Sequence, residues 1–281
     1  MIDLHTHTTC SDGTDSPFAL VKKALAAGIT TLAITDHDTT SGWEEAVSAI
    51  QTQIQLVLGA EISCLTTDGI SVHMLGLLFD GDNAEIQQML ADSRDTRIPR
   101  MKKMIELMNS DGFDITIEDV YRATPEGATV GRPHLADALV AKGIVSHRDE
   151  AFSHLLNNDS KYYVTHMAPT PADAITTIRK AGGVAVIAHP FASRRGQTIT
   201  AATFSDLVVA GLNGIEVHHR DQNAEEQATL TDIARELNLV ITGASDYHGT
   251  GKLNGLAENT THQAQWELLE SMADARRVVK I

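Results

Sequence analysis

Short apolar segments alternate with helical segments along most of the chain, and this alternation limits the possible folds more than any other feature. The helical segments carry recognisable start signals, such as Ser16 as a potential N-cap before Pro17 at the first helical position. Strand–helix–strand repetition is typical of α/β proteins with a mostly parallel sheet, which can close as a barrel. We therefore predict strands at 2–4, 31–35, 56–62, 72–79, 184–188, 214–217 and 239–242, and helices at 17–27, 171–181 and near 41–51, 201–210 and 224–237.

Residues 83–164 interrupt this alternation, because their apolar positions follow helical patterns only. Met101, Met104 and Met108, for example, recur at helical spacing. We expect 83–164 to be an inserted helical subdomain. Residues 1–82 and 165–281 would then form one α/β domain on either side of it.

The charge balance and the apolar pattern exclude several kinds of partner. Lys and Arg number 22 and Asp and Glu 37, which gives a formal net charge of −15. This excess of negative charge argues against binding of long nucleic acids or of an anionic membrane surface. Cys10 and Cys64 are too few for a disulfide scaffold, no signal peptide is recognisable, and no apolar stretch is long enough to cross a membrane. We expect a cytoplasmic protein with no membrane contact.

Potential metal ligands gather where the predicted strands end. In a (β/α) barrel these strand ends converge on one face, so we expect the side chains to meet in one cleft. Imidazole and carboxylate without thiolate suit Mn, Fe or Zn. The donors are too many for one ion and indicate two or three ions that share bridging groups. Six histidines and three carboxylates make up this set: His5, His7, Asp12, His37, Glu61, His73, His189, Asp246 and His248.

The same residues stand in an ordered series of motifs that resembles the PHP (polymerase and histidinol phosphatase) family over nearly the whole chain. The motifs are Asp3-x-His5-x-His7, Ser11-Asp12-Gly13, Thr35-Asp36-His37-Asp38, Gly59-x-Glu61, His73-x-x-Gly76, Ala188-His189-Pro190 and Ser245-Asp246-x-His248. The resemblance implies a distorted seven-stranded (β/α) barrel with a centre of two or three metals. It implies one ion on His5, His7, Glu61 and Asp246, a second on Asp12, His37 and His248, and a third on Glu61, His73 and His189.

Within the family, the helical insertion resembles that of the stand-alone nucleotide phosphoesterases. Arg94-Asp-Thr-Arg97 is similar to the paired-arginine helix start of that group, and Gly131-Arg132-Pro133-His134 is similar to its Arg-x-His element. The resemblance implies that 83–164 forms part of the substrate pocket and that Asp12, Arg94, Arg97, Arg132 and His134 bind substrate. Guanidinium groups match phosphate geometry, so a small nucleotide with two phosphates would fit beside the metals.

The implied activity is hydrolysis of a nucleotide phosphate monoester by metal-activated hydroxide, with the 3′-phosphate of a 3′,5′-bisphosphate nucleotide as the favoured target. The catalytic set would be His5, His7, Asp12, His37, Glu61, Asp246 and His248.

Three other functions stay open at this point. The first is 5′–3′ cleavage of short 5′-phosphorylated RNA in the same cleft. The second is a histidinol-phosphate phosphatase, against which the helical insertion and the arginines speak. The third is a module that binds metal or nucleotide without catalysis, which the complete ligand set disfavours.

Some residues near the motifs have no assigned role. After His189-Pro190 this chain continues with Phe191-Ala-Ser-Arg194-Arg195, where the relatives usually continue with Gly-Arg-Tyr. The roles of Arg194, Arg195, His218 and His219 are left open, as are the identity of the metals and any protein partner. The remaining histidines match no motif and are expected to have no role: His147, His154, His166 and His262.

Overall fold

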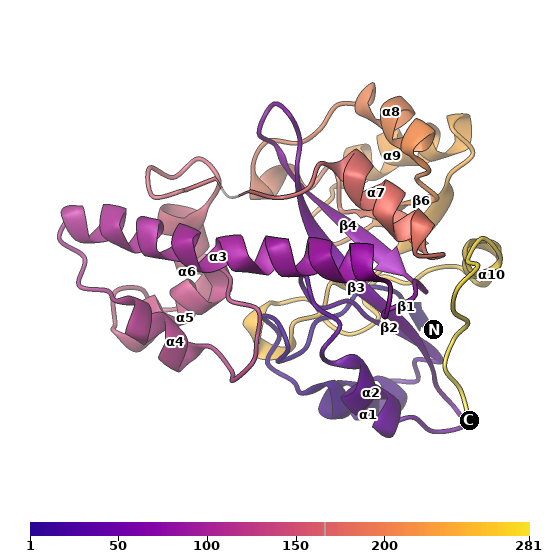
Figure 1. The fold of residues 1–281 in the computed structure, drawn as a ribbon, viewed down its shortest axis with the longest axis horizontal. Coiled ribbons are helices and arrows are strands. Elements are labelled where there is room, and N and C mark those ends of the chain that lie inside the picture. Colours follow the sequence, from indigo (N-terminus) through magenta and orange to yellow (C-terminus); the bar gives the residue numbers. More distant parts are fainter. Residues whose placement is uncertain (166) are drawn as a thin grey trace.

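The computed structural model describes residues 1–165 and 167–281, so His166 lies outside the described residues. Within them, seven strands form one sheet in the order of the sequence (Figure 1). An isolated parallel bridge between Thr6 and Tyr247 brings the chain after the first strand beside the chain after the last. The sheet is therefore nearly closed, and the predicted barrel is confirmed. Its strands are β1 (Ile2–Asp3), β2 (Thr31–Ile34), β3 (Gln55–Leu65), β4 (Ser71–Leu77), β5 (Val184–Ala188), β6 (Gly214–His218) and β7 (Val240–Gly243).

Strand β4 runs opposite to its neighbours, whereas the other pairs in the sheet are parallel. Only residues 66–70 connect β3 to β4, and so short a connection permits antiparallel pairing but not a parallel crossover. The reversal matters for His73, which lies near the start of β4 and pairs with Ser63 and Ala188. It puts His73 at the end of the barrel where β3 and β5 finish.

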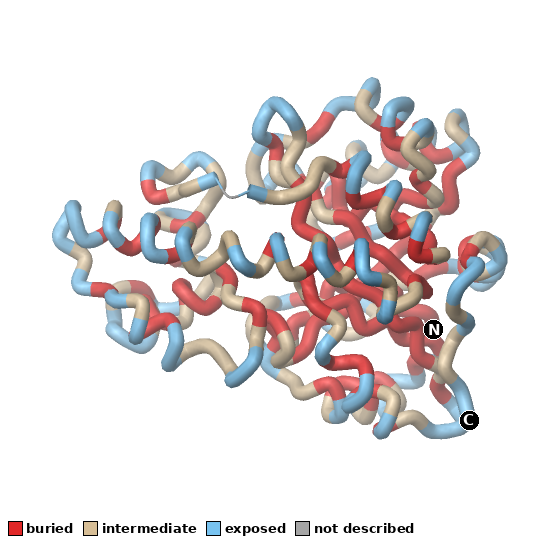
Figure 2. The backbone as a smooth tube through the Cα atoms, viewed as in Figure 1, coloured by how far each residue is buried: buried red, intermediate tan, exposed pale blue. Residues whose placement is uncertain are grey.

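Successive residues of a strand face opposite sides of the sheet and therefore contribute to two separate hydrophobic clusters. In β5, Val184, Val186 and Ala188 belong to the cluster inside the barrel, whereas Ala185 and Ile187 pack against the surrounding helices. Both faces are covered, which explains why the strands were recognisable as nearly continuous apolar runs. Figure 2 shows the resulting band of buried backbone through the barrel. The surrounding helices are α1 (Pro17–Ala26), α2 (Trp43–Ser48), α7 (Pro171–Lys180), α8 (Thr203–Ala210) and α9 (Ala224–Glu236). Helix α10 (Gln263–Ser271) instead packs Trp266 and Leu269 against the inner cluster.

A second group of helices has a core of its own. The long helix α3 extends from beside the barrel into this group (Figure 1). Met104 and Met108 of α3 pack there with Leu135, Leu139 and Leu156. The division of the chain at residues 83 and 164 stays a prediction. The group comprises α3 (Ala84–Ser110), α4 (Ile117–Ala123), α5 (Arg132–Ala141), α6 (Arg148–Ala151) and a π-helical turn at Phe152–Leu156.

Helix α3 is continuous through Pro99, although proline lacks the N–H that an interior helical position donates. Helix α10 was not among the predicted helices. It begins after His262, without the Ser, Thr, Asp or Asn that usually marks a helix start. Among the described residues, no helix combines the length and apolar character that a membrane crossing requires.

Candidate metal centre

The nine predicted ligands lie together at one end of the barrel. Each has a nitrogen or carboxylate oxygen within 3.7 Å of such an atom in another member of the set. Most are fully buried, and the side chains of His37 and His73 are 14% and 26% exposed. The strand ends supply them as predicted, with Glu61 and His73 from within β3 and β4.

Four donor atoms form the tightest group. His5 Nε2 lies 3.1 Å from both His7 Nε2 and Glu61 Oε2, and His7 Nε2 also lies 3.1 Å from Glu61 Oε2. Asp246 Oδ1 lies 3.5 Å from His5 Nε2 and 3.3 Å from His7 Nε2. A tetrahedral ion with ligand bonds of about 2.0–2.1 Å has ligands separated by about 3.3–3.4 Å. The spacing of this group therefore fits one divalent ion.

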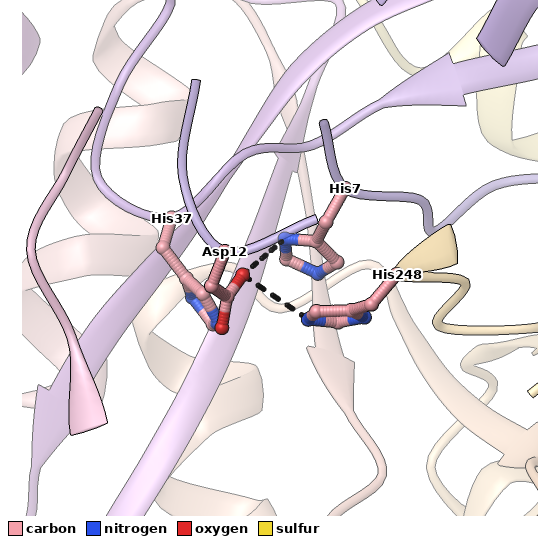
Figure 3. Close-up of side chains that lie close together, drawn as sticks. All are labelled: His7, Asp12, His37 and His248. Carbon is pink, nitrogen blue, oxygen red and sulfur yellow. Dashed lines mark ion pairs between the residues drawn. The ribbon is translucent and has the colours of Figure 1, made fainter. Parts of the chain in front are cut away.

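A second group surrounds Asp12, as Figure 3 shows. Asp12 Oδ1 lies 3.2 Å from His248 Nε2 and 3.7 Å from His7 Nδ1, and Asp12 Oδ2 lies 3.7 Å from His37 Nε2. His248 Nε2 is buried and, apart from this close approach to Asp12, has no contact of hydrogen-bond geometry among the described residues. A buried nitrogen without a partner is costly, and a cation between these donors would satisfy it. His7 Nδ1 also faces this group, but because Nε2 of the same ring belongs to the first group, Nδ1 would carry the proton and the second group keeps Asp12, His37 and His248 as its ligands.

A third group meets at Glu61. Glu61 Oε1 lies 2.7 Å from His73 Nδ1 and 3.3 Å from His189 Nε2, which brings the implied third set together. His37 Nδ1 also lies 3.2 Å from Glu61 Oε2. Glu61 thus contacts members of all three groups and is placed to bridge ions.

Without cations, protons would have to balance the carboxylates of this cluster. Burial alone would lower the pKa of His7, but the hydrogen bonds that the ring donates to Asp246 and Glu61 raise it to about 9. Burial lowers the pKa of His248 to about 4. Burial raises the pKa of Glu61, but the nearby histidines, His5 first, hold it well below its usual value. The carboxylates are therefore anionic at neutral pH and attract divalent cations.

Asp36 holds the loop that carries Asp12 in place through hydrogen bonds. Asp36 Oδ1 accepts hydrogen bonds from Thr8 N at 2.7 Å and from Ser11 Oγ at 2.6 Å. The loop also passes very close to His7, since a Cβ on Gly13 would lie 2.5 Å from the His7 carbonyl oxygen. Only glycine fits there, which explains the Ser-Asp-Gly sequence.

Three non-glycine residues at the site have backbone conformations with positive φ. They are Asp38 at 52°, His189 at 31° and Asp246 at 52°. Such conformations cost free energy for residues with a Cβ and gather at functional sites. Two of the three are predicted ligands, and Asp38 directly follows His37.

The paired arginines of α3 bind the protein itself. Arg97 forms an ion pair with Asp38 and donates to Ser63 Oγ at 2.9 Å and to the Val130 carbonyl at 3.3 Å. Arg94 donates to the Asp38 carbonyl at 2.6 Å. Both residues therefore fasten α3 to the segment after β2. Their predicted role in substrate binding stays a prediction.

Arg132 has a different environment. Its guanidinium lies 5.3 Å from the centre of the Tyr163 ring, and that of Arg100 lies 5.1 Å from the same ring. Arg132 donates to the Leu156 carbonyl and Asn158 Oδ1, both at 2.7 Å, and neither arginine pairs with a carboxylate among the described residues. Burial, followed by the charge of Arg132, lowers the pKa of Arg100 to about 9.

His134 caps its own helix. Its Nδ1 accepts the N–H of Gly131 at 3.0 Å at the start of α5. The side chain is buried, and burial lowers its pKa. The cap uses one ring nitrogen, so only Nε2 is left for the predicted contact with substrate.

Several residues that touch the centre were missed in the sequence, as Lys252 and Glu216 were, or had their role left open, as Arg195 and His219 did. Asp246 Oδ2 contacts Arg195 at 2.7 Å, Lys252 at 2.9 Å and His219 Nε2 at 3.4 Å. A bulge in β6 between Glu216 and His218 shifts the alternation, so His219 is buried at the site and His218 is exposed. No pattern in the sequence reveals a bulge. Glu216 did carry a signal, since it is a charged residue inside the apolar strand β6.

Comparison with known proteins agrees with this geometry. The model of the PHP domain matches residues 3–163, more than half of the chain. The chain belongs to the PHP domain family. A 5′-3′ exoribonuclease of Haemophilus influenzae is 33% identical over 247 residues, which cover 88% of this chain and 89% of that protein. A 3′,5′-nucleoside bisphosphate phosphatase of Chromobacterium violaceum is 31% identical over 252 residues, covering 89% and 88%.

A solved structure extends the similarity to the whole PHP fold. It is that of a protein from Bifidobacterium adolescentis assigned as a metal-dependent phosphoesterase. It shares 40% sequence identity and superposes with a TM-score of 0.91 over 97% of this chain and 96% of that one. The seven-stranded PHP barrel expected from the sequence is therefore the observed fold.

Proposed function

We propose that this PHP protein is a metal-dependent phosphoesterase that removes the 3′-phosphate from a 3′,5′-bisphosphate nucleotide. One observation carries the choice of substrate: Arg132 lines a cavity of about 90 Å³ together with His73 and His189. A cationic side chain and two candidate metal ligands thus face the same space. The charges around this space match those of a small molecule with two anionic groups.

The second anionic group would bind at Arg132 and Arg100. Two half-buried guanidinium groups near one tyrosine, without a carboxylate partner among the described residues, are electrostatically unfavourable together. A bound phosphate would compensate both charges and form charge-assisted hydrogen bonds. Arg100 thereby joins Arg132 in the proposed subsite, whereas Arg97 is already neutralised by Asp38.

The donor groups suit two or three divalent ions such as Mn²⁺, Fe²⁺ or Zn²⁺. The holding residues would be His5, His7, Glu61 and Asp246 in one group, Asp12, His37 and His248 in a second, and Glu61, His73 and His189 in a third. When bound, such ions supply Lewis acidity and lower the pKa of water. Asp246 offers Oδ1 to this centre, and Arg195 and Lys252 keep its Oδ2 in place.

The test measures phosphate release from adenosine 3′,5′-bisphosphate with added Mn²⁺, in parallel with adenosine 5′-monophosphate, histidinol phosphate and a 5′-phosphorylated RNA trimer. We expect fast release from the bisphosphate with accumulation of adenosine 5′-monophosphate, loss of the activity with a chelator, and recovery with Mn²⁺. Turnover of histidinol phosphate without turnover of the bisphosphate would overturn the substrate assignment.

A second candidate is 5′–3′ cleavage of short 5′-phosphorylated RNA. It is favoured by the 33% identity to a protein named for that activity. The terminal 5′-phosphate would bind at the same arginines, and the scissile phosphodiester at the same cluster. Release of mononucleotides from the trimer, at a rate above that of the bisphosphate, would select this function.

A further inference from the structure

Glu216 is a fully buried carboxylate that contacts the candidate metal ligand His5. Neither the family motifs nor the proposed reaction uses it. It lies in β6, while the residues that it contacts follow β1 and β5. Among the described residues, its ion pair is with His5. A buried carboxylate is costly unless its oxygens accept hydrogen bonds, so the two oxygens indicate what it does.

The first oxygen contacts the ring of His5. Glu216 Oε1 lies 3.1 Å from His5 Nδ1, whereas the other ring nitrogen, Nε2, faces the group formed with His7, Glu61 and Asp246. An ionised carboxylate can only accept, so the proton of a neutral His5 must be on Nδ1. The lone pair of Nε2 then points at the group formed with His7 and Glu61, as a metal ligand requires.

The second oxygen holds the turn that carries His189. Glu216 Oε2 accepts the backbone N–H of His189 at 3.0 Å. His189 has φ of 31°, an uncommon conformation that needs support from its surroundings. This hydrogen bond provides such support, and the His189 ring reaches Glu61 Oε1 at 3.3 Å.

Both oxygens of Glu216 thus already face an N–H group. Glu216, His5 and His189 do lie close enough to surround an ion, but such an ion would displace the proton of His5 Nδ1. Glu216 itself is fixed by Gln222, which donates to its backbone carbonyl at 3.0 Å. The arrangement is that of an acceptor that orients ligands.

We propose that Glu216 is a positioning residue of the metal centre, which sets the tautomer of His5 and the direction of His189. This inference rests on the metal centre proposed above. Metal-ligating histidines commonly donate their other N–H to a carboxylate, and removal of such a partner lowers metal affinity or activity by about 10–100-fold.

The informative variant is Glu216→Gln, which keeps the size of the side chain. If the amide oxygen accepts from His189, the amide N–H₂ faces His5 Nδ1 and favours the tautomer with the proton on Nε2. The affinity of metal-free protein for Mn²⁺, measured by calorimetry without substrate, should fall about 10–100-fold. The exposed Glu236→Gln in α9 is the matched control and should leave the affinity unchanged.

A second readout separates positioning from packing. In Zn²⁺-loaded protein with ¹⁵N-labelled histidine, the wild type should show His5 protonated on Nδ1, and Glu216→Gln should lose that signal. Glu216→Asp keeps the charge and should retain more Mn²⁺ affinity than Glu216→Gln; if Glu216→Gln does not fold, Glu216→Asp is compared with Glu216→Ala in the same way.

The outcomes distinguish this inference from the proposed function. Equal Mn²⁺ affinity in the wild type and Glu216→Gln, with an unchanged His5 signal, would overturn the positioning role alone. A wild-type protein that binds no divalent ion would instead overturn the metal centre, and the positioning role with it.

Discussion

Asp246 shows how one side chain connects the candidate ligands to the rest of the molecule. Its Oδ1 faces His5 and His7, and its Oδ2 contacts Arg195 and Lys252. Burial would raise its pKa, but surrounding positive charges, that of Lys252 first, hold the pKa well below the usual value. The carboxylate is therefore ionised throughout the neutral range.

We expect Asp246→Ala to lower turnover by at least about 100-fold, because loss of one preorganised charge at a reacting centre has effects of this size. Phosphate release and bound metal should be measured on the same preparation. Asp232→Ala, at an exposed position of α9, is the control. Unchanged turnover in Asp246→Ala would contradict the assignment of this residue to the metal centre.

Arg132 gives a prediction about substrate choice. A hydrogen bond to a charged group contributes about 1.5–3 kcal/mol, so Arg132→Ala should raise KM for the bisphosphate by about 10–150-fold. A substrate with one phosphate should be affected much less, since it leaves the arginine subsite empty. Arg235→Ala is the control, because Arg235 is 72% exposed on α9. Equal effects on both substrates would argue against a second phosphate at Arg132.

The predicted ligands and the missed residues differ in how the chain brings them to the site. His5, His7, Asp246 and His248 follow strands at fixed short spacings, and such spacings are visible in a sequence. Arg100 lies near Arg132 because both guanidinium groups pack on the ring of Tyr163. Contacts of that kind depend on how separate elements pack, which the sequence pattern does not describe.

At the scale of elements, the strands and helices around the barrel were predictable because each has a clear period and clear end signals. Helix α7, for example, begins after the N-cap Thr170 with Pro171 at its first position. The direction of β4 was not predicted, since an apolar run has the same pattern in either direction. The bulge in β6 was equally invisible.

That bulge leads to a prediction, because it turns His219 and not His218 toward the centre. His219 Nδ1 accepts the N–H of Asp221 at 3.0 Å, so the proton of the neutral ring is on Nε2, which faces Asp246 Oδ2. We expect His219→Ala to lower phosphate release per folded molecule about 10-fold or more, as for other residues that orient metal ligands. His218→Ala should have no effect. The reverse order of effects would contradict the alternation described for β6.

At the scale of the whole molecule, protons and metal ions compete for one cluster. In the metal-free protein, the pKa of His7 is raised to about 9, and that of His248 is lowered to about 4. A histidine with a raised pKa stabilises the fold below pH 6.5, its usual pKa, and that stabilisation is lost as the pH rises through 9. A histidine with a lowered pKa costs stability as the pH falls from 6.5 to 4.

The metal-free protein should therefore be most stable near pH 6.5. Each of the two histidines should lower the free energy of unfolding by about 3 kcal/mol across its own pH window, from 6.5 up to 9 for His7 and from 6.5 down to 4 for His248. The free energy of unfolding in urea, measured from pH 4.5 to 9.5 with a chelator present, checks this. Mn²⁺ affinity should increase from pH 6.5 to 9, because the ion displaces the proton of His7. A stability that does not change across this range would contradict the account of the cluster.

We infer that strand ends far apart in the sequence form one metal centre. Anomalous diffraction from crystals of the protein grown with Mn²⁺ would locate the ions without reference to activity. We predict peaks within the group of His5, His7, Glu61 and Asp246 and within the group of Asp12, His37 and His248, with a third at Glu61, His73 and His189 when all sites are filled. Mn²⁺ bound only at other positions, or none bound at saturating concentration, would contradict the claim.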